Sequence, residues 1–140
     1  MFAIIRILTA ATLLSLLAVA ADAYGQTNMN VKAVEIAQMP RFCWAQLAVP
    51  NANGDEFRIH DCGYAANHYC GALVSLIRAK HSANKAERLD LVRLADTDVA
   101  YTERGIKDYP KCSIREHVDA TRAEVNNLLV LYGGRRPKAQ

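Results

Sequence analysis

The sequence has little net charge and lacks a common motif of serine enzymes. Among 140 residues, 17 lysines and arginines stand against 14 aspartates and glutamates, which gives a net charge of +3 at neutral pH. A dedicated nucleic-acid-binding protein would carry a concentrated basic face, so this balance argues against that class. No Gly-x-Ser-x-Gly motif is present to mark a nucleophilic serine.

Long alternation of polar and apolar residues is also missing, and so is an internal repeat of fixed period. Without a period-2 run of useful length there is no signal for a β-sheet. Apolar residues instead recur at helical spacing over much of the chain. We therefore predict an all-α fold, a small antiparallel helical hairpin or bundle that forms a single domain over residues 24–134.

A long apolar run occurs at one place, residues 7–21, after the base Arg6. With Ala21-Asp22-Ala23 behind it, the run has the pattern of a secretory signal peptide, cleaved near Ala23 or a few residues later near Gly25. A retained membrane anchor would need about 20 apolar residues, and this run has about 15. We expect residues 1–23 to be removed, which would leave no stable membrane anchor.

The use of cysteine fits an exported protein. All four cysteines follow the apolar run, and the first of them is too far from it for a lipoprotein anchor. An even number of cysteines in an oxidising compartment predicts two disulfides. No Asn-x-Ser/Thr sequence offers a glycosylation site, which fits a bacterial protein. We expect a periplasmic or secreted location.

Two helices are predicted in the middle of the chain. Apolar residues at spacings of three and four predict the first near residues 63–80. The second should begin after Asn84 as N-cap, with Glu87 reaching back as in a capping box. It should end by Tyr109, because Pro110 disfavours helical geometry in the residue before it.

The clearest amphipathic helix comes last. It follows Ser113-Ile114-Arg115-Glu116, which has the form of a full capping box, and Gly133-Gly134 should end it. One or two short helices are expected in residues 34–48, and a turn in residues 50–55, where Asn-Gly tolerates positive φ. Residues 135–140 are expected to form a short, basic, disordered tail.

Four cysteines allow three disulfide connectivities. Pairing Cys62 with Cys70 is the poorest, because eight residues of helix would separate them by roughly 12 Å, whereas bridged Cα atoms lie within about 7 Å. In an up-down-up arrangement, Cys62 and Cys112 lie at the same end. We prefer Cys43–Cys70 with Cys62–Cys112; Cys43–Cys62 with Cys70–Cys112 is the alternative.

The densest cluster of chemically versatile side chains comprises His60, Asp61, Asn67 and His68. One hypothesis adds Cys62 and Cys70 to the two histidines as a zinc site, although the spacing differs from that of common zinc modules. Another makes His68 a general base oriented by Asn67 or Asp61. The structural alternative is that Asn67 and His68 begin a helix and hydrogen-bond a neighbouring loop. We expect neither a cofactor nor a catalytic site.

Acidic side chains recur along the second helix and alternate with basic ones. Mixed signs along a helix usually mark a face exposed to solvent, so we expect such a face here. The acids are Asp90, Asp96, Asp98, Glu103 and Asp108. A metal site built from Asp96 and Asp98 is not expected, because these two side chains should point apart.

Two segments carry resemblances. Residues 62–79, which contain Cys-Gly-x₃-Asn-His-Tyr-Cys-Gly-x-Leu, resemble a pattern of small, uncharacterised exported proteobacterial proteins. The run from Ala100-Tyr101 through Tyr109-Pro110 to the last helix resembles the end of a tetratricopeptide (TPR) unit. The TPR resemblance implies a helical hairpin and protein–protein binding. It implies no activity.

We therefore expect an exported, non-enzymatic helical protein that binds another envelope or secreted protein, and no nucleic acid. One alternative is a small enzyme or metal-binding protein centred on His60, Asp61, Asn67 and His68. Another alternative is a secreted effector or inhibitor.

Overall fold

The computed structural model describes residues 30–133. The residues from Val31 onward form a compact unit of their own. The predicted signal peptide, residue 134 and the basic tail of residues 135–140 lie outside the described residues.

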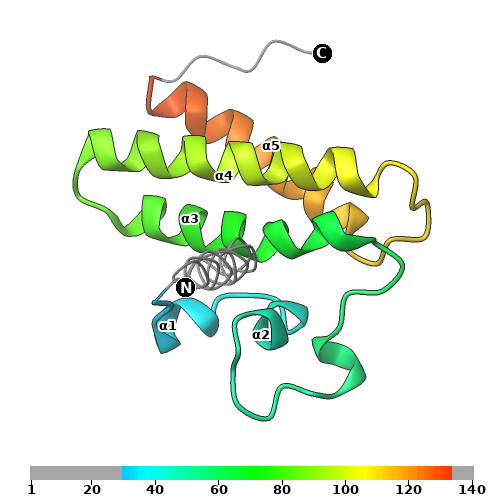
Figure 1. The fold of residues 1–140 in the computed structure, drawn as a ribbon. Helices are drawn as coiled ribbons and strands as arrows, with labels where there is room; N and C mark the ends of the chain where they lie inside the picture. Colours follow the sequence, from blue (N-terminus) through cyan, green and yellow to red (C-terminus); the bar gives the residue numbers. More distant parts are fainter. Residues whose placement is uncertain (1–29, 134–140) are drawn as a thin grey trace, which may run out of the picture. The chain divides into compact units, whose positions relative to one another are not determined.

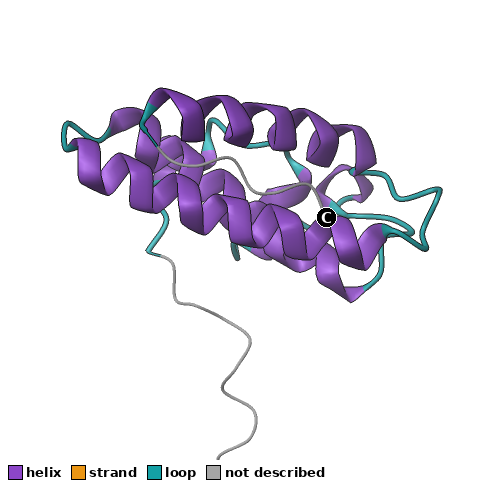
Figure 2. Ribbon diagram, turned by 90° about the horizontal axis from the view of Figure 1, so that it is seen from above, coloured by secondary structure: helices purple, strands orange, loops and turns teal. Residues whose placement is uncertain are grey.

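The described part of the chain is built from helices and contains no strand, which confirms the all-α prediction. Its five α-helices and two 3₁₀ helices are connected by short loops (Figures 1 and 2). In chain order they are α1 (Ala33–Ile36), α2 (Phe42–Gln46), η1 (Asp55–Phe57), η2 (Tyr64–His68), α3 (Tyr69–His81), α4 (Lys85–Ile106) and α5 (Arg115–Leu131). Within residues 30–133, no helix is both long enough and apolar enough to cross a bilayer.

The long helix α4 packs against both α3 and α5; α4 turns back on α3, and α5 turns back on α4 (Figure 1). Apolar side chains at helical spacing make their common core, which includes Leu76, Val92, Val99, Val118 and Val125. Tyr69 joins α3 to α5, since its buried hydroxyl lies 2.7 Å from Thr121 Oγ1 and donates to the carbonyl of His117 at 3.0 Å. Burial raises the pKa of Tyr69.

Two disulfides attach the irregular N-terminal part to this bundle. Cys43 on α2 is bonded to Cys70 on α3, and Cys62 before η2 is bonded to Cys112 before α5. The preferred connectivity is therefore confirmed. The segments that these bonds hold, α1, α2 and η1, are short and have little regular structure of their own.

Predicted helix ends are partly right. Asn84 caps α4, accepting hydrogen bonds from the N–H groups of Ala86 and Glu87 at 2.9 and 3.2 Å. The rest of the capping box is wrong. The Glu87 carboxylate accepts from the Ser82 hydroxyl instead, and that hydroxyl accepts the Asn84 N–H. The short connection places Ser82 within reach of both groups.

The capping box predicted for α5 is also wrong. Ile114 occupies the N-cap position without a side-chain hydrogen bond, and the Ser113 hydroxyl accepts from the N–H of His60 at 2.9 Å. The hydroxyl of Ser113, which the local sequence pattern predicts to cap α5, is thus bonded to a residue that is distant in the sequence. Gly133, with φ of 83°, ends α5 as predicted.

The turn of residues 50–55 and the acidic face of α4 differ in detail from expectation. Positive φ occurs at Asn51 (63°), while Gly54 has φ of −73°. The face of α4 is not simply solvated, because Asp96 and Glu103 both pair with Arg122 of α5, Glu103 Oε2 at 2.8 Å from Arg122 Nη2. This guanidinium therefore fastens α5 to α4, and hydrogen bonding to Glu103 raises the pKa of Arg122.

Candidate functional site

The cluster suggested by the sequence is divided among three places in the fold. His60 belongs to the junction between the loop and α5, where its backbone exchanges hydrogen bonds with Ser113. Its Nε2 atom lies 3.3 Å from Asp55 Oδ1, and both side chains are well exposed. His60 therefore faces η1 rather than the other members of the cluster.

His68 lies at the end of η2 and faces α4. Its Nδ1 atom is 3.4 Å from Asp98 Oδ1, and its ring centroid is 4.3 Å from that of Tyr101. The residue that orients His68 is thus Asp98, not Asn67 or Asp61, and its contact is with a helix rather than a loop. Burial raises the pKa of Asp98, although the hydrogen bond to His68 works in the opposite direction.

Asp61 and Asn67 are brought together on an open pocket of about 380 Å³, here called the Asp61 pocket. The other side chains that matter for its chemistry are Gln46, Phe57, Arg58 and Ile59. Cys62 and Cys70 are bonded to other cysteines, so their sulfurs are not available as zinc thiolates. Among residues 30–133, no three His, Cys, Asp or Glu side chains are grouped closely enough to hold a metal.

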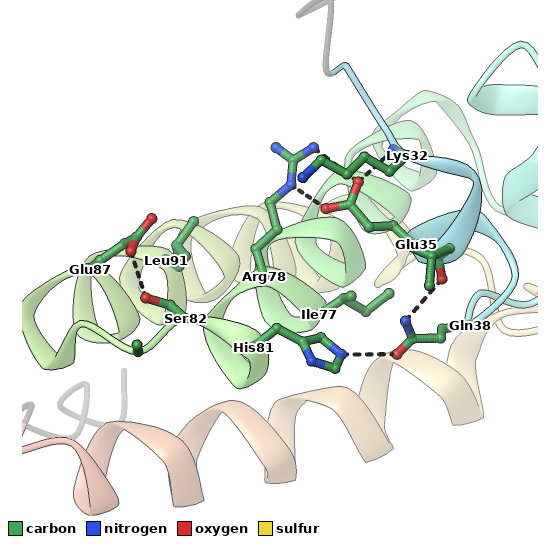
Figure 3. A pocket seen from close by; sticks show the side chains of 11 residues that line it. Lys32, Glu35, Gln38, Ile77, Arg78, His81, Ser82, Glu87 and Leu91 are labelled. Atoms are coloured by element: carbon green, nitrogen blue, oxygen red, sulfur yellow. Dashed lines mark hydrogen bonds and ion pairs between the residues drawn. The ribbon is translucent and has the colours of Figure 1, made fainter.

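A larger groove of about 620 Å³ lies where α1 approaches α3 and the start of α4, and is here called the α1–α3 groove (Figure 3). From α1 and its flanks it is lined by Lys32, Val34, Glu35 and Gln38. From α3, the following loop and α4 it is lined by Ile77, Arg78, His81, Ser82, Ala83, Glu87 and Leu91.

An ion pair between Glu35 and Arg78 holds α1 against α3. Arg78 Nε lies 2.7 Å from Glu35 Oε1, and Nη2 lies 3.2 Å from Oε2. The backbone N–H of Lys32 donates to the same carboxylate at 2.7 Å, and Figure 3 shows both side chains turned toward Glu35. Only 9% of the Glu35 side chain is exposed, against 34% of Arg78.

The pKa values of this pair follow from its geometry. Hydrogen bonding to Arg78 holds the pKa of Glu35 below the ordinary 4.5, despite burial, which acts in the opposite direction. The same hydrogen bond raises the pKa of Arg78. Both groups are therefore charged at neutral pH, and each satisfies the other.

Other polar groups of the α1–α3 groove also have partners within the chain. The Ser82 hydroxyl donates to Glu87 Oε2 at 2.5 Å, and the Gln38 amide donates to the carbonyl of Val34 at 2.9 Å. His81 Nε2 lies 3.5 Å from Gln38 Oε1 (Figure 3). Beside these paired groups lies an apolar strip of Val34, Ile77 and Leu91, in which Val34 is 65% exposed, Leu91 is partly buried and Ile77 is buried.

Sequence reasoning missed the residues of this groove, although one signal was present. Glu35 lies eight residues before Cys43, and Arg78 lies eight residues after Cys70. Once these cysteines are paired, the disulfide brings the two segments together, and the opposite charges that they carry can form an ion pair. No local pattern reveals this, because the two charges are far apart in the chain.

Comparison of this chain with protein-family models, with curated proteins and with solved structures finds no match. The resemblances to TPR hairpins and to small exported proteobacterial proteins therefore stay predictions. Any proposal about function depends on the residues and distances of this chain.

Proposed function

We propose that this protein is an exported, non-enzymatic helical protein that binds another protein of the bacterial envelope through the α1–α3 groove. The partner segment would be short and amphipathic. Its apolar side chain would cover Val34 and Leu91.

The observation that carries this proposal is the exposed side chain of Val34, together with the partly buried Leu91, beside polar groups that already have partners. Glu35 is paired with Arg78, and Glu87 accepts from Ser82, so neither acid needs a ligand to satisfy it. What the groove offers a partner is chiefly the apolar area of Val34, which is 65% exposed, with a smaller contribution from the partly buried Leu91. Covering such area is the main source of affinity in protein association, at roughly 25 cal/mol per Å² before the costs of binding.

Rigidity and compartment support the same proposal. The Cys43–Cys70 bond and the Glu35–Arg78 pair fix the two sides of the groove. Binding of a partner would therefore cost little conformational entropy in the groove. Two disulfides are consistent with an oxidising compartment outside the cytoplasm. A binding partner is then sought among envelope proteins.

The test is photo-crosslinking in cells that produce the protein naturally. A crosslinking amino acid is placed at Val34, and the matched control is placed at Leu131 on α5, because the two side chains are similarly exposed, 65% and 69%. We expect one protein to crosslink at Val34 and not at Leu131. The crosslink should be lost in Leu91→Asp, which inserts a charge into the apolar strip.

Leu131→Asp serves as the control for that substitution, because it adds the same charge outside the groove. Circular dichroism and intact disulfides must show that both variants fold. Equal crosslinking from Val34 and Leu131, or a crosslink at Val34 that survives Leu91→Asp, would contradict the proposal.

A further inference from the structure

The Asp61 pocket differs from the groove in that its polar side chains have no partner within the part of the chain that the structure describes. We propose that this pocket binds a small zwitterion of the free α-amino-acid class, with its carboxylate at Arg58 and its ammonium group at Asp61. This inference is independent of the proposed protein-binding function, because the two sites share no lining residue.

The charges of the pocket carry the argument. Arg58 and Asp61 both line it, yet no ion pair joins them. Within residues 30–133, none of the side chains of Gln46, Arg58, Asp61 and Asn67 makes a hydrogen bond or ion pair with another residue. One cation, one anion and two amides, all of them exposed to solvent, thus line one pocket without a partner among these residues. An α-amino acid carries the complementary pair of charges.

The backbone that presents Asp61 is held firmly. His60, the residue before it, exchanges two hydrogen bonds with Ser113, at 2.9 and 3.0 Å, and Cys62, the residue after it, is bonded to Cys112. Between these anchors Asp61 adopts φ of 54°, a left-handed conformation that Asp tolerates better than most residues. Its carboxylate is therefore presented from a fixed loop rather than a flexible one.

The residue that follows Cys62 in this loop, Gly63, is restricted by a close contact with Tyr109. Gly63 has φ of 67°, and a Cβ atom there would lie 2.7 Å from the ring of Tyr109. A side chain at Gly63 would collide with that ring, so glycine is required on both counts. The loop is thus fixed from several directions, and this rigidity lowers the entropy cost of binding a small ligand.

The volume of the Asp61 pocket and its apolar lining residues limit which ligands it can bind. A volume of about 380 Å³ lies near the lower end of the range for small-molecule pockets. Phe57 and Ile59 line the same space, and Ile59 also packs against the core. These residues would cover an apolar side chain of the ligand while the charges hold its polar end. An aliphatic amino acid such as L-leucine meets these requirements.

The experiment follows the backbone amides of the full chain by NMR, with both disulfides formed. We expect L-leucine to shift the amides of Asp61 and Asn67, with a Kd of about 0.1–1 mM. L-leucine methyl ester lacks the carboxylate, and N-acetyl-L-leucine lacks the ammonium group. Each should bind at least about tenfold more weakly, because one charged hydrogen bond is lost.

Variants locate the site. Arg58→Gln and Asp61→Asn should each weaken L-leucine binding about tenfold or more, and Asn keeps the tolerance for positive φ. Arg104→Gln and Asp108→Asn make the same exchanges at exposed positions outside the pocket and should leave binding unchanged.

Three results would overturn the inference. The first is the absence of any shift at about 10 mM L-leucine, which is far above the expected Kd. The second is equal binding of L-leucine and its two derivatives. The third is binding that survives both pocket substitutions while the variants keep the native amide spectrum.

Discussion

The α1–α3 groove and the Asp61 pocket are both bordered by disulfide-linked segments, but they use polar side chains in opposite ways. In the groove, Glu35 and Arg78 satisfy each other and fasten α1 to α3. In the pocket, Arg58 and Asp61 have no partner within residues 30–133. The charges of the groove therefore contribute to the fold, whereas those of the pocket are available to a ligand.

This difference predicts where substitutions affect stability and where they affect binding. A paired, half-buried charge is costly to lose because its partner is left uncompensated. An exposed, unpaired charge costs little to remove, usually within about 0.5 kcal/mol. The four predictions below test the distinction.

The largest effect is expected from removing the disulfides. The Cys62→Ser/Cys112→Ser variant opens a loop of 50 residues and should lower the free energy of unfolding by about 4 kcal/mol. The Cys43→Ser/Cys70→Ser variant opens a loop of 27 residues and should lower it by about 3.5 kcal/mol. Urea unfolding measures both values.

Amide hydrogen exchange shows whether each disulfide stabilises its own region, the α1–α3 groove or the Asp61 pocket, independently of the other. Loss of Cys62–Cys112 should raise exchange in residues 58–67, and loss of Cys43–Cys70 should raise it in residues 32–38. If either variant raised exchange equally in both segments, the groove and the pocket would be one cooperative unit and the comparison would fail.

The second effect is expected from Glu35→Gln. It leaves Arg78 without its counter-charge and should lower the free energy of unfolding by about 2 kcal/mol near pH 7, less than for a fully buried pair because Arg78 is one-third exposed. Glu124→Gln is the matched control, since Glu124 pairs with Lys80 at the exposed surface. It should have a much smaller effect.

The pH dependence of this effect has a definite sign. Because Arg78 lowers the pKa of Glu35 below 4.5, the ionised carboxylate stabilises the folded state above that pH. The contribution is lost as the pH falls through the folded-state pKa. The difference between wild type and Glu35→Gln should therefore shrink from about pH 7 to about pH 3. A difference that stayed constant would show that the charge of Glu35 is not what stabilises the fold.

The third largest loss of stability is expected when the hydrogen bond that holds the loop before Asp61 is removed. Ser113→Ala removes the acceptor of the His60 N–H and should lower the free energy of unfolding by about 1 kcal/mol. Glu116→Ala should have little effect, because Glu116 makes no capping hydrogen bond in α5. Comparable losses in the two variants would indicate that the local capping box forms after all.

These cases show which parts of the structure the sequence could reveal. Helical spacing and the cap at Asn84 are local, so the helices of the bundle could be predicted. Disulfide pairing followed from helix length and direction, which limit the distances that cysteines can bridge. The helices can be predicted from residues close together in the sequence. The disulfides can be predicted from the relative positions of helix ends.

Tertiary competition for polar groups could not be predicted in this way. The local patterns offered Ser113 and Glu87 as capping residues, but His60 and Ser82 lie closer to them in the folded chain. Asp98 likewise reaches His68 across two elements. The candidate cluster was consequently divided, because nearness in sequence does not fix the direction in which each side chain points.

The smallest effect is expected from Asp61→Gly. Glycine adopts positive φ without strain, so the loss of the unpaired carboxylate should change the free energy of unfolding by no more than about 0.5 kcal/mol. L-leucine binding should nevertheless be lost, since Asp61 is the one acidic side chain among the described residues that line the pocket. Urea unfolding and the NMR titration are made on the same sample. A loss of stability as large as that of Glu35→Gln would mean that Asp61 contributes to the fold as Glu35 does, and the distinction between the two regions would then disappear.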